Sequence, residues 1–145
     1  MENQNTSFFS EYQSPYLQAA VALGAMLVFM ILGKISGMDF TFPWTTAGAV
    51  LLMFSVFNSI NSLTTENMLA YYRDSIFSYM ALVALGAGLA YLFSAVSINE
   101  AGTYRWIYFM ITLSYFGFIG IVSFIRFILG ILEVEHKNLS KRQDD

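Results

Sequence analysis

The polar residues that could do chemistry in this chain gather near the end of its second apolar segment. Ser55, Asn58 and Ser62 recur at helical positions i, i+3 and i+7, so they share one face of a helix. Asn61 lies next to that face. Amide and hydroxyl groups inside a membrane either hydrogen-bond to neighbouring helices or line a path for a small polar solute. The pattern leaves both roles open and favours helix packing.

Arg126 is the second candidate, because an ionisable residue within an apolar segment is unusual. Counted from Trp106 at 1.5 Å per residue, it lies about 30 Å along a helix, near the far boundary of a hydrocarbon core. Two structural roles suit that depth. Arg126 can be an interfacial anchor that reaches the headgroups, or it can form an ion pair with Glu66 or Asp74. We favour these roles over catalysis or transport.

Four apolar segments must position these residues, and they span about 16–33, 44–63, 75–96 and 106–132. Each approaches the roughly 20 residues that cross a hydrocarbon core of about 30 Å. Because lipid offers no hydrogen-bond partner to the backbone, we expect each segment to be a helix, and the last to continue as a helix beyond the membrane. The predicted fold is all-α, a single integral membrane domain (1–145) that forms a four-helix bundle with both termini on the same side.

The composition also favours lipid as the solvent. Hydrophobic residues make up 57% of the 145 residues and charged residues 12%, against about 25% charged in a typical soluble domain. A net charge of −3 without a basic patch argues against nucleic acid as a partner. The chain has no cysteine and one histidine, which excludes thiolate chemistry and a histidine-rich metal site in one chain. We therefore expect no catalytic residue, cofactor or metal.

Lysine and arginine are distributed unevenly over the two predicted sides of the membrane. The side with both termini carries Arg73, Arg126, Lys137, Lys141 and Arg142, and the other side carries Lys34 and Arg105. The positive-inside rule therefore predicts cytoplasmic termini, in a cell (inner) membrane. Trp44 and Trp106 begin spans at the opposite side, where indole rings favour the interface.

Small residues recur at spacings that let helices approach closely. Gly86 and Ala90 show this spacing in the third segment, and Gly117 and Gly120 belong to a similar series in the fourth. Such residues lower the distance between helix backbones in lipid. We expect both sets to pack within the bundle.

Three functions remain open. The favoured one is a non-enzymatic accessory or scaffolding subunit of a membrane assembly, since the apolar segments carry little reactive chemistry. The alternatives are a homo-oligomeric transporter or channel and a membrane-embedded lipid-modifying or conjugating enzyme. A transport path is less favoured because no ionisable residue lies near the midplane. An enzyme is less favoured because the inner face carries no nucleophile–base pair or metal cluster. The expected partners are the lipid bilayer and either another protein or further copies of this chain.

Overall fold

The computed structural model describes residues 14–65 and 68–143, and every long element in these ranges is a helix. The helices are α2 (Pro15–Ile35), α3 (Phe42–Thr64), α4 (Met68–Ser94) and α5 (Tyr104–Gln143). Each contains a stretch long and apolar enough to cross a membrane. The predicted all-α fold with four long apolar helices is therefore confirmed.

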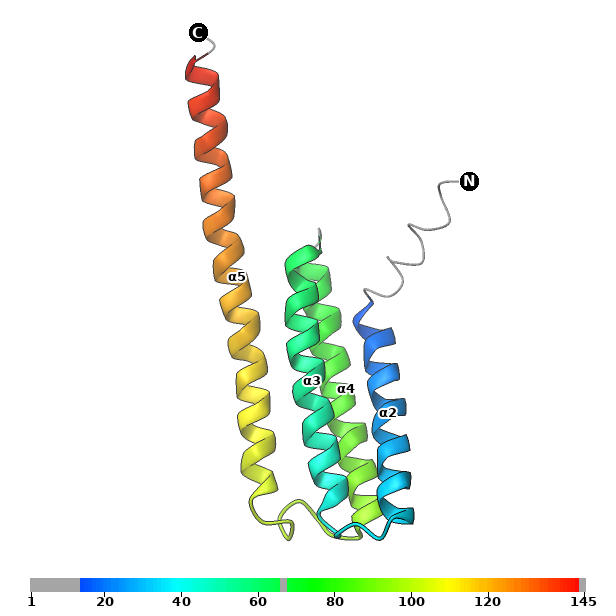
Figure 1. Cartoon of the computed structure of the whole chain (residues 1–145). Helices are drawn as coiled ribbons and strands as arrows, with labels where there is room; N and C mark the ends of the chain where they lie inside the picture. Colours follow the sequence, from blue (N-terminus) through cyan, green and yellow to red (C-terminus); the bar gives the residue numbers. More distant parts are fainter. Residues whose placement is uncertain (1–13, 66–67, 144–145) are drawn as a thin grey trace, which may run out of the picture.

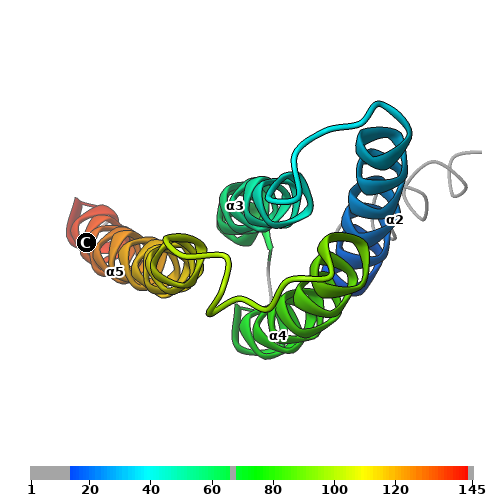
Figure 2. The same ribbon diagram turned by 90° about the horizontal axis from the view of Figure 1, so that it is seen from below.

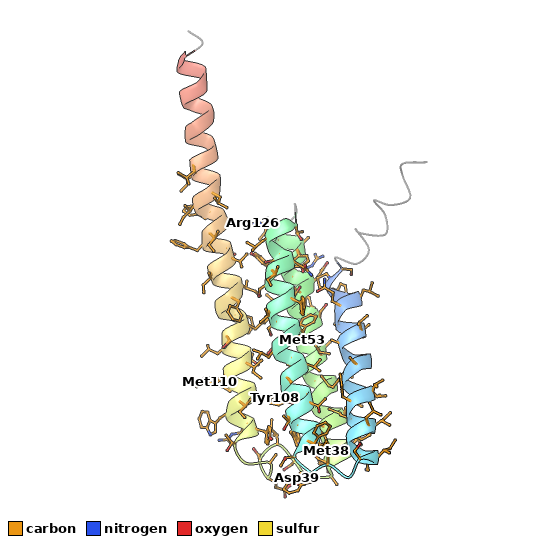
Figure 3. All side chains as sticks on the ribbon, viewed as in Figure 1. Met38, Asp39, Met53, Tyr108, Met110 and Arg126 are labelled. Atoms are coloured by element: carbon orange, nitrogen blue, oxygen red, sulfur yellow. The ribbon has the colours of Figure 1, made fainter. Side chains whose placement is uncertain are left out.

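Successive helices run in opposite directions, as Figure 1 shows. The start of α2, the end of α3 and the start of α4 thus lie at one end of the bundle. Arg126 of α5 lies at the same end (Figure 3). This end of the bundle is named the Arg126 end below, and the opposite end is named the Trp44 end.

Local sequence explains the bounds of the first two helices. Pro15 and Pro43 occupy the first turns of α2 and α3, where a missing N–H costs no hydrogen bond. After α2, Gly37 adopts a φ of +68°, which suits a residue without a side chain. This turn lets the Met38 N–H donate to the Gly33 carbonyl at 3.0 Å, so the chain leaves the helix with its last carbonyls paired.

The fourth span agrees with the prediction, whereas the helix of the third has different bounds. α4 begins at Met68 rather than at 75, so Arg73 and Asp74, which pair with each other at 2.9 Å, lie within the helix. It ends at Ser94 rather than at 96, because Ala95 adopts a φ of 56° and its N–H donates to the Tyr91 carbonyl at 2.8 Å. α5 continues to Gln143, which confirms the predicted helical extension of the fourth span.

α3 is the central helix of the bundle. It packs against each of the other three, and α5 lies beside it on the side away from α2 (Figure 2). Half of the apolar stretch of α3 is buried, compared with 11% of that of α5. α2, α3 and α4 therefore form a packed unit, and α5 is attached along one side of α3.

The apolar core of the packed unit includes Met26, Met30, Leu51 and Leu82, all of them buried. Gly86 of α4 brings α2 close, since a Cβ at this position would lie 3.0 Å from the Met26 sulfur. This is the close approach predicted for the third segment.

The glycines of α5 behave differently. Apart from the neighbouring backbone of α5 itself, no atom lies within 4 Å of the place where a Cβ would stand at Gly117 or Gly120. The prediction that these two pack within the bundle is therefore wrong. They face outward because α5 presents only one side to α3.

Candidate functional site

Asn58 lies at the centre of a hydrogen-bond cluster that joins α3, α4 and α5. Its side-chain nitrogen donates to Ser75 Oγ and, at 3.3 Å, to the Tyr115 hydroxyl. The Tyr71 hydroxyl donates to Asn58 Oδ1 at 2.6 Å. Ser75 and Tyr115 also hydrogen-bond to each other. These four residues are named the Asn58 cluster below.

The Asn58 cluster is closed, which here means that its members are buried and that they hydrogen-bond to one another. The exposed fractions of Asn58, Ser75 and Tyr115 are 1%, 2% and 0%, and that of Tyr71 is 6%. A side-chain amide offers two donor hydrogens and one acceptor oxygen, and both ends of the Asn58 amide have partners here. The cluster is therefore satisfied by protein groups alone, as a buried polar network must be to avoid a desolvation penalty.

Aromatic packing holds Tyr115 in place. Its ring stacks on Tyr79 of α4 with centroids 4.1 Å apart and an interplanar angle of 19°. The Tyr79 hydroxyl bonds Thr112 Oγ1 of α5 at 3.0 Å, and the Tyr79 ring stacks on Phe54 of α3. These contacts bring α5 against α3 and α4 at a fixed depth, so the Tyr115 hydroxyl reaches Asn58.

The predicted polar stripe of α3 divides into two parts. Ser55 and Ser62 are buried with Asn58, and their hydroxyls donate to the carbonyls of Leu51 and Ser59 at 2.8 and 2.6 Å. Their polar groups are thus satisfied within α3 itself. Asn61 is only partly buried and lines a cleft between α2 and α3.

Arg126 binds the end of α3. Its Nη1 donates to the Thr65 carbonyl at 2.7 Å, and its Nη2 donates to the Leu63 carbonyl. The last carbonyls of a helix have no partner within the helix, so the guanidinium supplies a C-terminal cap from α5. Of the predicted acidic partners, Glu66 lies outside the described residues and Asp74 bonds other groups.

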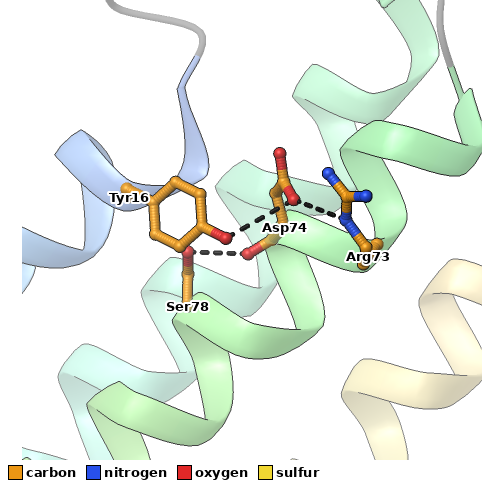
Figure 4. Close-up of polar contacts among 4 residues, drawn as sticks. All are labelled: Tyr16, Arg73, Asp74 and Ser78. Atoms are coloured by element: carbon orange, nitrogen blue, oxygen red, sulfur yellow. Dashed lines mark hydrogen bonds and ion pairs between the residues drawn. The ribbon is translucent and has the colours of Figure 1, made fainter.

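Asp74 ties the start of α2 to α4 (Figure 4). Its Oδ1 accepts from the Tyr16 hydroxyl at 3.4 Å and from Arg73 Nε at 2.9 Å. The Asp74 carbonyl accepts from Ser78 Oγ at 2.7 Å. The structure thus brings Asp74 together with Arg73 and Tyr16, and not with Arg126.

A second polar cluster, at the Trp44 end, escaped the sequence analysis. Trp44 Nε1 donates to Ser94 Oγ at 3.1 Å and to the Val96 carbonyl at 3.2 Å. The Tyr108 hydroxyl donates to the Trp44 carbonyl at 3.3 Å, and the two rings meet edge to face at 5.8 Å. Trp44, Ser94, Val96 and Tyr108 are named the Trp44 cluster below.

The two tryptophans of the chain have different surroundings. Trp44 is only 2% exposed, whereas Trp106 is 59% exposed. A buried indole needs an acceptor for its N–H. Ser94, near the end of the third apolar segment, is that acceptor, yet nothing in the sequence pairs it with Trp44.

The Asn58 cluster is suited to joining helices. It consists of one amide and three hydroxyls, none of which carries a charge near neutral pH. In the part of the chain that the structure describes, no group of three His, Cys, Asp or Glu could hold a metal ion. Hydrogen bonds between membrane helices fix their register, and this cluster does so for three helices at once.

No protein-family model matches this chain, and no curated protein or solved structure is detectably similar to it.

Proposed function

We propose that this chain is a non-enzymatic accessory or scaffolding subunit of a membrane assembly. The observation that carries this proposal is the closure of the Asn58 cluster. An enzyme or a carrier needs polar groups that can meet a substrate, whereas the Asn58 amide is engaged by Ser75, Tyr71 and Tyr115. The polar interior of the bundle thus serves helix association.

We further propose that the four helices cross a cell (inner) membrane with both termini in the cytoplasm. The length and apolar composition of the four stretches support insertion. The excess of lysine and arginine on the side of Arg73 and Arg126 supports this orientation.

The shape of α5 supports a role in assembly. Residues 127–143 continue the helix past Arg126, beyond the end of α3 and the start of α4 (Figure 1). The first part of this extension is apolar and exposed, with Phe127, Leu129 and Leu132 all more than half exposed. A helix that projects from a bundle offers a partner a surface that the rest of the chain does not cover.

The test is purification of the tagged chain from its native membrane in mild detergent, followed by mass spectrometry of the retained proteins. We expect a larger membrane protein in fixed stoichiometry. Asn58→Leu should reduce the recovered complex because it disturbs helix register, whereas Asn61→Leu, the same change outside the cluster, should have a smaller effect. A stable homo-oligomer without any other protein would contradict the accessory role.

Transport is the second candidate, and one observation favours it. The hydroxyl and amide groups of the Asn58 cluster lie in the interior near the end of α3 that Arg126 caps. If they line a path, Asn58→Leu and Arg126→Gln should abolish solute or ion flux into liposomes while the folded oligomer survives. Normal flux through both variants would remove this candidate.

A further inference from the structure

A long cleft separates α2 from α3 on the outside of the bundle, with a volume of about 640 Å³. Small side chains lie along it, among them Ala25 of α2 and Ala49 of α3. Larger apolar side chains line it as well, including Phe29, Met53 and Phe57. Met53 is labelled on α3 in Figure 3.

The dimensions of the cleft limit what can occupy it. Its lining residues on α3 run from Phe42 to Asn61, about 28 Å at 1.5 Å per residue. Spread over that length, the volume corresponds to a groove narrower than the diameter of about 10 Å that a helix needs. An extended hydrocarbon chain therefore fits along the groove, whereas a helix of another protein would lie across its open side.

The polarity of the cleft also varies along its length. Gln18 of α2 and Asn61 of α3 bring two amides to its Arg126 end, the middle of the cleft is lined by apolar side chains, and Thr45 and Thr46 lie at its Trp44 end. The Thr45 hydroxyl there already bonds the Thr41 carbonyl and the Tyr104 hydroxyl. An amphiphile has the complementary pattern, a polar head followed by an apolar chain. An apolar cleft that stayed empty would lose dispersion contacts along its whole length, so an apolar occupant is favoured.

We propose that this cleft binds one acyl chain of a membrane glycerophospholipid. The ester and headgroup lie beside Gln18 and Asn61, and the chain runs past Ala25 toward Ala49. The site rests on the membrane insertion proposed above, and it does not depend on the accessory role.

The test uses the full chain in nanodiscs of palmitoyl-oleoyl phosphatidylethanolamine, released into the gas phase for native mass spectrometry. We expect the unaltered protein to retain one phospholipid. Ala25→Phe and, separately, Ala49→Phe fill the cleft from opposite walls and should each lower retention by about tenfold. Ala84→Phe is the matched control, because Ala84 is exposed on α4 and does not line the cleft, and it should retain the lipid.

Equal retention by all four proteins, or no retained phospholipid in the unaltered protein, would overturn the proposal. Because the chain has no cysteine, Ala49→Cys introduces a single thiol. A disulfide between two such chains in the membrane would show a second copy at the cleft and would also overturn it. Partner recovery is measured independently, so retained phospholipid without a protein partner would support this site and count against the accessory role alone.

Discussion

The Asn58 cluster and the Trp44 cluster both attach α5 to the rest of the bundle, but they use different partners. At Asn58, the bonds to Tyr71, Ser75 and Tyr115 join side chains. At Trp44, the acceptors include the backbone carbonyls of Val96 and of Trp44 itself. One attachment thus depends on the identity of every member, and the other depends in part on the path of the backbone.

The difference indicates which end of the molecule is more sensitive to substitution. A backbone carbonyl stays in place whatever side chain its residue carries, and at a chain connection it can turn to water when its donor is lost. A buried hydroxyl whose partner is removed stays buried and unpaired, which costs more free energy. The Asn58 cluster should therefore respond more strongly to mutation than the Trp44 cluster.

The largest expected effect is that of Asn58→Leu. This change removes the partner that Tyr71, Ser75 and Tyr115 share, so we expect the free energy of unfolding in detergent to fall by about 2 kcal/mol. Asn61→Leu is the matched control, since it makes the same change on α3 outside the cluster. A loss no greater than that of the control would mean that the closed network does not stabilise the bundle.

A smaller effect is expected for Trp44→Phe, which keeps an aromatic ring but removes the N–H that bonds Ser94 and Val96. We expect the free energy of unfolding to fall by about 1 kcal/mol, the contribution of an ordinary hydrogen bond. Trp106→Phe should leave stability unchanged, because Trp106 is mostly exposed. If Trp44→Phe costs as much as Asn58→Leu, the proposed difference between the two clusters is wrong.

The smallest effect concerns the connection next to the Trp44 cluster. Glu100 Oε2 accepts the Ser97 N–H at 3.0 Å and the Ser97 hydroxyl at 2.8 Å. Both bonds favour the charged carboxylate, so the pKa of Glu100 lies below its ordinary value. The turn is therefore stabilised above the ordinary glutamate pKa, and this stabilisation is lost as the pH falls through the lowered pKa of the folded protein.

The pKa of Glu100 can be measured by nuclear magnetic resonance, through the chemical shift of the Ser97 amide during a pH titration. We expect a midpoint below that of an unperturbed glutamate, and no such transition in Glu100→Gln. A midpoint at the ordinary value would show that the turn does not hold the carboxylate and that only the Trp44 cluster orders this end.

The sequence predicts the helices well because their length and apolar character are local properties. It also predicts that Ser55, Asn58 and Ser62 share a face, since that follows from helical periodicity. The helix α4 starts before the third apolar segment, since charged residues favour a connection in the sequence pattern, whereas Arg73 and Asp74 lie within the helix.

Pairings between helices could not be predicted in the same way. Arg126 bonds the carbonyls of Leu63 and Thr65, and a carbonyl acceptor has no signature in the sequence because every residue carries one. The Val96 carbonyl that Trp44 bonds has no such signature either. Tyr71 and Tyr115 belong to the Asn58 cluster only because α4 and α5 pack at one particular rotation about their axes.

The cap that Arg126 places on α3 also has a mechanical consequence. Past this fixed point, residues 127–143 continue α5 as a helix for about 25 Å. A helix bends little over such a length, so a rotation of α5 by about 10° at Arg126 displaces Gln143 by about 4 Å. α5 has the geometry of a lever whose fulcrum is the end of α3, in which a small change of angle inside the bundle becomes a large displacement at the tip.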